Sequence, residues 1–278
     1  MEPYHVVAPT PRAGSAADRP NSLTRSLLRH VEYLLIPVVL AAAVGLWNLV
    51  IALGGYPEFI LPAPASVWLR FLRLAADGTL WRHAGLTLQE ALGGFCLGLA
   101  FGTVVGYALA RSPLLEKIVA PYLVASQSIP IVALAPLLVL WFGFGLTAKV
   151  VASALICFFP ILINTIVGVR AIDAESRELM HTLSASARQV FWMLEVPAAL
   201  PVYLGGVRVG ITLSVIGAVV GEFVGADQGL GYLIAQSRGF FDTATMFVAL
   251  LALVAMALGL YLSVVGLERA LLAGRRRA

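Results

Sequence analysis

The side chains that could carry out chemistry are few in this sequence, and their spacing excludes the common reaction centres. Its two lysines, Lys117 and Lys149, follow Glu116 and Ala148, so no Gly-Lys-Ser/Thr sequence is present to cradle a nucleotide phosphate. The histidines stand at positions 5, 30, 83 and 181, which fits neither a Ser-His-Asp triad nor a metal cluster. We therefore expect no catalytic residue, no metal and no cofactor. An ATP-driven process would need a separate ATPase subunit.

The two cysteines also give no sign of a functional centre. Cys96 and Cys157 each lie within an apolar run, and their spacing matches no disulfide framework or metal motif. We expect both to be small buried hydrophobic side chains.

The composition is that of an integral membrane protein. Charged residues make up 12% of the chain and hydrophobic residues 60%, and the mean hydropathy is +0.90. Soluble domains usually carry about 25% charged residues, so a polar surface could not cover this chain in water. The net charge of +4 comes almost entirely from arginine. Its distribution fits orientation in a membrane better than binding to nucleic acid.

Six apolar runs are long enough to cross a bilayer, which takes about 20 residues in a helix. The predicted fold is therefore an all-α polytopic membrane protein with a six-span domain over 31–270. Residues 1–30 lack periodicity and predict a disordered cytoplasmic tail, and 271–278 predict a basic cytoplasmic tail. The first run starts late and lacks a cleavage pattern, so we expect a retained span rather than a signal peptide. The six predicted spans are 33–53, 85–110, 118–142, 147–169, 201–224 and 244–267.

The distribution of Lys and Arg predicts that both termini are cytoplasmic. Thirteen of these residues lie on the side of the termini and five on the other side, with Arg208 left out because it lies near the start of a span. Three of the five outer charges fall in the loop 54–84. That loop is expected to form a short interfacial helix, whose apolar face would consist of Val67, Trp68, Phe71, Leu72 and Leu74.

Small residues at regular spacing predict close helix packing. Gly94, Gly98, Gly102 and Gly106 recur every four residues in the second span, which favours a tight contact inside one helix bundle. The fifth span repeats the pattern, and there a contact inside the bundle and a subunit interface both remain open. Its small residues are Gly206, Gly210, Ser214 and Ala218, with a second series at Gly217, Gly221 and Gly225.

Prolines and polar side chains mark weak points in the spans. Pro130, Pro136 and Pro160 are expected to kink their helices. Polar groups inside spans usually face the bundle interior, where they form hydrogen bonds or line a translocation pathway. The candidates are Ser126, Gln127, Ser128, Asn164 and Glu222. For Glu222, which lies toward the outer end of the fifth span, a capping role is an equal alternative. The glycine-rich segment 225–234 predicts a turn and a short re-entrant or interfacial element.

The segment 170–200 is the longest charged interruption of the apolar sequence. Asp173 can cap a first helix, and Ser186 with Gln189 forms a capping box for a second. Ser184-Ala185-Ser186 predicts the turn between them, and Pro197 is expected to end the second helix. The pattern indicates two short helices at the cytoplasmic membrane surface. They could be amphipathic membrane-surface helices or a docking element.

This segment resembles the cytoplasmic Glu-Ala-Ala loop of binding-protein-dependent ABC importer permeases. That pattern runs Glu-Ala-Ala, three residues, Gly, nine residues, Ile, one residue, Leu-Pro. Its positions fall here on Glu178, Leu179-Met180, Ser184, Leu194 and Val196-Pro197, so the alanines and the glycine are replaced while the spacing is kept. The flanking stretches resemble the nitrate, sulfonate, taurine and pyrimidine-vitamin branch, over about 55–268. They include Pro62-Ala63-Pro64, Ser128-Ile129-Pro130, Leu140–Gly145, Gly221–Ala226 and Gly229–Tyr232.

The resemblance implies the permease of a type I ABC importer in the cell membrane. It implies a homodimer, one ABC ATPase under each subunit and an extracytoplasmic substrate-binding protein. The ATPases would act through a coupling helix within 174–187. The expected coupling residues are Arg177, Glu178, Leu179, His181, Leu183, Ser184, Ala185, Ser186 and Pro197.

The substrate and the energy source leave alternatives open. The motif sequences are most similar to those of permeases for riboflavin or thiamine-pyrimidine compounds. No basic residue lies deep in a span to neutralise an anion, which favours a neutral heterocycle. A sulfonate, taurine or nitrate permease remains an alternative. An ion-coupled transporter would require a charge relay, yet Glu222 is nearly alone in the spans. A membrane scaffold without transport activity is a third possibility.

Overall fold

The computed structural model describes residues 22–273, with side chains described from about residue 35 to 272, and every regular element in that part of the chain is a helix. The chain divides into two units, Met1–Gly55 and Tyr56–Ala278. The elements are α1 Ser22–Gly54, α2 Pro64–Ala76, α3 Thr79–Arg111, α4 Pro113–Gln127, α5 Ile131–Phe142, α6 Leu146–Arg170, α7 Ala174–Thr182, α8 Ala187–Gln189, the π-helix η1 Val190–Glu195, α9 Val196–Gly225, α10 Leu230–Gly239 and α11 Thr243–Ala273.

The first unit contains α1, a helix with a window long and apolar enough to cross a membrane at Pro37–Gly54. Because α1 begins at Ser22, residues 22–30 are helical and the prediction of a disordered tail is wrong for them. No glycine or proline interrupts the chain between Ser22 and Ile36, and leucine and arginine are good helix formers. The rest of that predicted tail, and residues 274–278 of the basic tail, lie outside the described part.

The structure has five helices long and apolar enough to span a membrane, and a sixth span if α4 and α5 are taken together. These two helices meet at 94°. The break falls at Ser128–Pro130, because Pro130 lacks a backbone N–H and restricts the residue before it. Pro136 and Pro160, by contrast, lie inside continuous helices. The expected kink is thus a sharp break in the third span.

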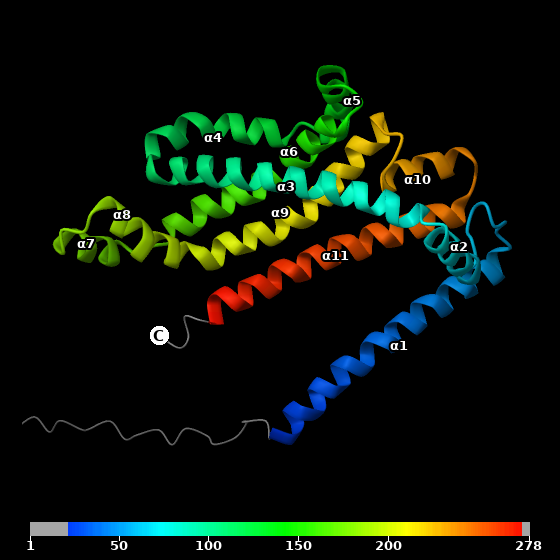
Figure 1. Ribbon diagram of the computed structural model, residues 1–278. Coiled ribbons are helices and arrows are strands. Elements are labelled where there is room, and N and C mark those ends of the chain that lie inside the picture. The colour runs from blue at the N-terminus through cyan, green and yellow to red at the C-terminus, as the bar shows by residue number, and fades with distance from the viewer. Residues whose placement is uncertain (1–21, 274–278) are drawn as a thin grey trace, which may run out of the picture. The chain divides into compact units, whose positions relative to one another are not determined.

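The centre of the second unit is α6, which packs mainly against α3 and α9 (Figure 1). The predicted glycine ridge of α3 is confirmed. A Cβ at Gly94 would lie 2.3 Å from the Ser153 Cβ, and one at Gly98 would lie 2.3 Å from the Cys157 Sγ. These two positions therefore require glycine for close approach of the helices.

The small residues of α9 also pack closely against α6. A Cβ at Gly206 would lie 2.5 Å from the Asn164 Cβ, and one at Gly217 would lie 2.4 Å from the Ser153 Cα. Of the two alternatives for the fifth span, a contact inside the bundle and a subunit interface, these positions therefore make the contact inside the bundle. Cys157 is buried as expected, but Cys96 is exposed. It lies two residues from both Gly94 and Gly98, and two residues turn an α-helix by about 200°, away from α6.

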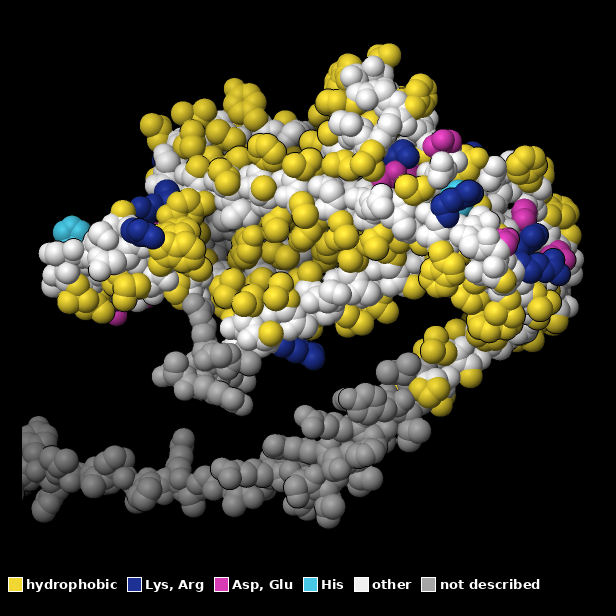
Figure 2. Space-filling model, viewed as in Figure 1, with side chains coloured by type: hydrophobic (Ala, Val, Ile, Leu, Met, Phe, Trp, Pro, Cys, Tyr) yellow, Lys and Arg dark blue, Asp and Glu magenta, His cyan; other side chains and the backbone are white. Residues whose placement is uncertain are grey.

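The remaining helices flank this three-helix centre. Helix α11 covers the groove between α3 and α9, where Leu253, Met256 and Leu260 pack against Ala91, Val215 and Ala218. The segment predicted to form an interfacial helix is helical, as α2, and the turn predicted after residue 225 leads into the short helix α10. In the second unit, α7 lies at one end of α3 and α2 at the other (Figure 1). Charged side chains gather at these two ends, and hydrophobic side chains dominate the surface between them (Figure 2).

Candidate coupling site and its buried anchor

The helix-turn-helix at 174–189 has the predicted caps. The Asp173 carboxylate accepts a hydrogen bond from the Ser176 backbone N–H at 3.0 Å. Hydrogen bonds from the side chain and backbone of Ser176 lower the pKa of Asp173 below its usual value. The capping box is also present, with Ser186 and Gln189 each bonded to the other's backbone N–H. Both helices of this element thus begin at residues that the sequence identified.

Ser184 makes the turn that a glycine would usually make. Its φ is +51°, in the left-handed region. The Ser184 N–H donates to the His181 carbonyl at 2.9 Å, and the Ala185 N–H donates to the Met180 carbonyl at 3.0 Å. This pair of bonds is a Schellman motif, which satisfies the last carbonyls of α7. The replacement of glycine therefore leaves the turn geometry intact.

Most of the predicted coupling residues lie on the outside of this element. Leu179 is 59% exposed and Leu183 is 67% exposed. Ala185 and Pro197 are half-buried, and the other exposed members are Glu178, His181, Ser184 and Ser186. Arg177 is different, because its guanidinium turns inward and donates to the Val169 carbonyl at 2.8 Å. Its position is that of an anchor rather than part of the outer surface.

The expectation that Pro197 ends the second helix is wrong. Residues 187–225 form one continuous helical span, in which the π-helix η1 immediately precedes Pro197. Pro197 lies in the first turn of α9. A proline is tolerated in a first turn, and the wider π-helical register comes just before it. The helix therefore changes its hydrogen-bond register at η1 and continues through Pro197 instead of ending there.

A buried glutamate that the sequence analysis did not single out holds this element to the spans. Glu195 is 1% exposed. Its Oε1 accepts from Arg111 Nη1 at 2.8 Å and from Arg177 Nη1 at 3.1 Å, and its Oε2 accepts from Tyr107 at 2.7 Å. We call these four residues, Glu195, Arg111, Arg177 and Tyr107, the coupling anchor. The sequence signal was a single carboxylate in the apolar run Val190–Pro197.

The coupling anchor joins three parts of the fold. Arg111 and Tyr107 belong to the end of α3, Arg177 belongs to α7, and Glu195 ends η1 and leads into α9. Next to it, Arg170 at the end of α6 pairs with Glu116 at 2.5 Å and donates to the Leu109 carbonyl at 3.3 Å. Charge-assisted hydrogen bonds therefore connect α7 to the end of α3 and to the start of α9.

The predicted pathway residues fall into separate places. Ser126, Gln127 and Ser128 lie together at the break between α4 and α5, and all three are exposed. The Ser126 hydroxyl donates to the Leu123 carbonyl at 2.8 Å. Asn164 lies on α6, half-buried, and donates to the Pro160 carbonyl at 2.8 Å. Among the predicted pathway residues named here, the three at the break therefore form an exposed polar group.

Glu222 belongs to a buried polar cluster at the other end of the bundle. It accepts hydrogen bonds from the Thr87 hydroxyl at 2.6 Å and from the Gly231 N–H. The Gly229 N–H donates to His83 Nδ1 at 2.9 Å, and the Leu230 N–H donates to Thr87 at 2.8 Å. These bonds satisfy the exposed N–H groups at the start of α10. They hold the turn before α10 against α3.

The description of Glu222 as nearly alone in the spans is wrong. Glu90, on α3, is 2% exposed and pairs with Lys149 of α6 at 2.9 Å. The sequence pattern places Lys149 among the outer loop charges and does not single out Glu90, because each is one charge in an apolar run. Arg208 of α9 pairs with Glu268 of α11 at 3.3 Å.

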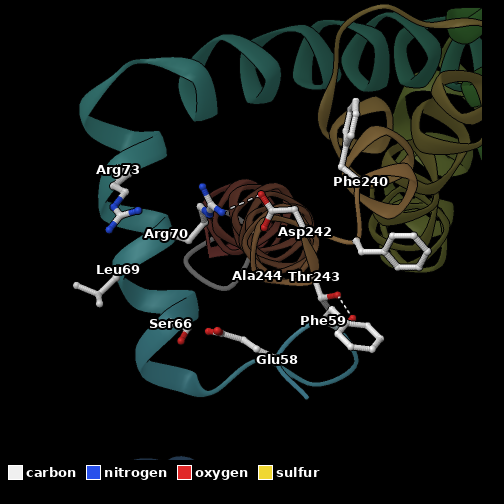
Figure 3. Close-up of a pocket in the computed structure, with 11 residues that line it drawn as sticks. Glu58, Phe59, Ser66, Leu69, Arg70, Arg73, Phe240, Asp242, Thr243 and Ala244 are labelled. Atoms are coloured by element: carbon white, nitrogen blue, oxygen red, sulfur yellow. Dashed lines mark hydrogen bonds and ion pairs between the residues drawn. The ribbon is translucent and has the colours of Figure 1, made fainter. Parts of the chain in front are cut away.

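A cavity of about 740 Å³ opens near α2 and the turn between α10 and α11 (Figure 3). Arg70 and Asp242 point toward each other across it and pair at 2.9 Å. Two aromatic side chains on the turn, Phe240 and Phe241, are 78% and 69% exposed. Phe241 has a φ of +56°, which is unusual for an aromatic residue. The turn therefore presents two rings in a fixed conformation.

Comparison with known proteins agrees with this arrangement. Residues 98–277 match the family described as "Binding-protein-dependent transport system inner membrane component". The riboflavin transport system permease protein RibX of Chloroflexus aurantiacus is 49% identical over 236 residues, which cover 85% of this chain and 88% of that protein. The formylaminopyrimidine transport permease protein ThiX of Halalkalibacterium halodurans is 35% identical, with 84% and 92% covered.

A third relative and a solved structure extend the comparison. The putative aliphatic sulfonates transport permease protein SsuC of Bacillus subtilis is 34% identical, with 78% of each chain covered. A chain of the inward-facing MetNI methionine ABC transporter superposes with a TM-score of 0.57 at 21% identity, with 69% of this chain and 94% of that chain covered. That likeness shows the fold, an all-α type I ABC importer permease. The chain belongs to the family of binding-protein-dependent transport system inner membrane components and is the permease of an ABC importer.

Proposed function

We propose that this permease imports a small heterocyclic vitamin compound, of the riboflavin or thiamine-pyrimidine type. ABC ATPase subunits that dock on the α7 turn drive the import. The observation that carries the docking role is the coupling anchor, in which a buried carboxylate binds two arginines and a tyrosine from different elements. A membrane-surface helix would need no such connection to the spans α3 and α9. The chain hydrolyses no ATP itself, since its sequence has no phosphate-binding loop.

In this proposal both termini and α7 are cytoplasmic. The thirteen-to-five distribution of Lys and Arg supports this orientation. The cytoplasmic surface that meets the ATPase consists of Glu178, Leu179, His181 and Leu183, with the Ser184–Ser186 turn at its end. Two leucines surrounded by polar side chains fit the apolar centre and polar rim of a protein interface.

The functional unit is a homodimer in which α4 and α5 meet the second copy. None of the residues of α4 is buried. On α5 the side chains of Val132, Leu140 and Trp141 are 60%, 76% and 65% exposed. Ser126, Gln127 and Ser128 would then lie on the pathway between the two copies, and Asn164 on the same pathway deeper in the bundle. For Glu222 we propose a positioning role, because its carboxylate is bonded to Thr87 and Gly231.

The extracytoplasmic binding protein docks at the cavity beside α2 and the Phe240–Phe241 turn. Exposed, rigidly held aromatic residues next to a charged cavity fit the anchors of a protein interface. The backbone of Phe241 is supported by the Phe241 N–H bond to the Arg238 carbonyl at 3.3 Å and by the Asp242 N–H bond to the Ser237 carbonyl at 2.9 Å. The left-handed backbone of Phe241 is thus held in place for a partner.

The choice of substrate rests on the relatives. The 49% identity to a riboflavin permease and the 35% identity to a formylaminopyrimidine permease favour a heterocyclic vitamin compound. A sulfonate or taurine substrate is the second candidate, supported by the 34% identical sulfonate permease.

Reconstitution in vesicles tests the proposal. The chain is inserted with its ATPase and binding protein, and uptake of labelled riboflavin, formylaminopyrimidine and taurine is measured with and without ATP. We expect ATP-dependent uptake of one heterocycle. ATP-dependent uptake of taurine alone would replace the substrate by the second candidate. Uptake without any ATPase that follows an ion gradient would refute the importer mechanism.

Docking is tested separately with Glu178→Arg. We expect this charge reversal on the outside of α7 to abolish co-purification with the ATPase while the spans remain folded. The matched control is Glu175→Arg, an exposed acidic residue one turn earlier on the same helix. Normal co-purification of the Glu178 variant would contradict the assignment of the docking surface.

A further inference from the structure

We infer that the groove between α3 and α9 beside the coupling anchor binds one anionic phospholipid, with an acyl chain in an apolar cavity and the phosphate at Arg111.

The cavity has a volume of about 490 Å³ and is walled by α3, α6, η1 and α9. Its lining is mainly apolar and aromatic, with Val104, Val169, Phe191, Trp192 and Leu200 among its residues. Val104 is 68% exposed and Trp192 is 60% exposed, so the cavity opens on the side of the bundle. An apolar cavity of this kind excludes water and accepts hydrocarbon.

The cavity continues a groove that α11 fills farther along. There, Val264 of α11 packs against Val207 and Ile211 of α9. None of the residues that line the cavity belongs to α11. Because the walls α3, α6 and α9 are membrane spans, hydrocarbon chains of the bilayer are the material next to this opening.

The charge at the cytoplasmic end of the cavity specifies the head group. Arg111 and Arg177 both bind the same carboxylate oxygen of Glu195, so two positive charges meet one negative charge. The Arg111 side chain is 44% exposed, and its guanidinium lies 6.0 Å from the centre of the Tyr107 ring. Tyr107 and Glu195 both line the cavity. A basic group between spans on the cytoplasmic side suits an anionic phosphate.

The lipid would act on the coupling anchor. Phe191 and Trp192 of η1 form part of the wall, and Glu195 at the end of η1 is the centre of the coupling anchor. A chain in the cavity fills the space behind η1, and a phosphate at Arg111 compensates the excess positive charge. The lipid therefore stabilises the arrangement in which α7 is tied to the spans. This consequence for coupling and the cytoplasmic position of Arg111 rest on the proposed function, whereas retention of a lipid in the cavity does not.

Lipid binding is tested on the full chain in detergent by native mass spectrometry. Phosphatidylglycerol and phosphatidylcholine with identical acyl chains are supplied in equal amounts. We expect one retained lipid per chain, with about a five-fold preference for phosphatidylglycerol, since one arginine near an anionic head group contributes about this factor. Inorganic phosphate in excess is expected to leave retention unchanged, because the acyl chain supplies part of the affinity.

The matched variants are Val104→Phe, which fills the mouth of the cavity, and Leu97→Phe. Leu97 is 42% exposed and lies seven residues earlier on the same face of α3, outside the cavity. We expect Val104→Phe to lose the retained lipid and Leu97→Phe to keep it. Equal retention of both lipids, or full retention by Val104→Phe, would overturn the inference.

Absence of any retained lipid from the wild-type chain would also overturn it, and cross-linking would then show whether a helix of a second copy covers the cavity. Retention is measured without ATP or transport. A failure of the transport proposal would therefore leave this result untouched, and a failure of lipid retention would leave the transport proposal standing.

Discussion

Replacing Glu195 by glutamine is the sharpest test of the coupling anchor, because it removes a charge and keeps the shape. The glutamine carbonyl can still accept from both arginines. Its NH₂ group would then face Tyr107, whose hydroxyl can turn from donor to acceptor. The buried site therefore retains its hydrogen bonds, and the change acts on their strength.

The magnitude follows from the type of each bond. A hydrogen bond to a charged group contributes about 1.5–3 kcal/mol, and one between neutral groups about 0.5–1.5 kcal/mol. Two arginine bonds are affected, but Arg111 and Arg177 are 44% and 36% exposed, so water screens part of the difference. We expect a loss of about 1–2 kcal/mol, which is about five- to thirty-fold in the equilibrium that holds α7 to the spans.

The assay measures transported substrate and hydrolysed ATP in the same vesicles. The outer surface of α7 is unchanged in Glu195→Gln, so the ATPase should still co-purify and hydrolyse ATP. Transport per ATP should fall about five- to thirty-fold. The matched control is Arg188→Gln, which removes an exposed arginine of α8 that is not a donor to Glu195. An unchanged ratio of transport to hydrolysis in Glu195→Gln would refute the reasoning.

Four further predictions concern other parts of the chain. Ser184→Val should weaken the α7 turn by about 1–2 kcal/mol while Ser184→Gly does not, because a β-branched residue resists the left-handed conformation; ATPase co-purification at rising urea measures this. The lowered pKa of Asp173 means that its cap is complete at neutral pH and is lost as the pH falls through that lowered value; a spin label on α7 should gain mobility there in wild type but not in Asp173→Asn. Gly98→Ala should cost about 1–3 kcal/mol in detergent unfolding, because its Cβ would meet the Cys157 Sγ, whereas Gly85→Ala in the same helix should not destabilise, since a Cβ there meets no atom within 4 Å and alanine is the better helix former. Phe240→Ala should reduce the affinity for the binding protein about ten-fold without changing ATPase activity measured in its absence, and an unchanged affinity would contradict docking at this turn.

Local rules were sufficient for the parts of the fold that depend on short stretches of chain. The glycine spacing of α3, the cap at Asp173 and the capping box at Ser186 could be read directly, because each depends on residues within one or two turns of helix. The break of the third span was expected only as a kink. The sequence shows that Pro130 cannot continue a helix, but the angle between α4 and α5 depends on what the two helices pack against.

The buried charges could not be found in the same way. Glu90, Lys149 and Glu195 each look like one isolated charge in an apolar run, where a snorkelling side chain and a buried ion pair have the same sequence pattern. The three partners of Glu195 lie 88, 84 and 18 residues away along the chain. Pro197 was misjudged for a related reason. The rule that proline ends a helix holds for regular α-helical register, whereas η1 changes the register before the proline.

The sequence by itself determined that this chain is a bundle of membrane helices with a capped helical element between two spans. Those conclusions follow from hydrophobicity and local capping, which are properties of short segments. Only the tertiary structure decided which charges are buried, which are paired and which helix the coupling element is tied to. An ion pair inside a membrane protein is stable only when folding brings its partners together, and that distance is set by the packing of α3, α6 and α9.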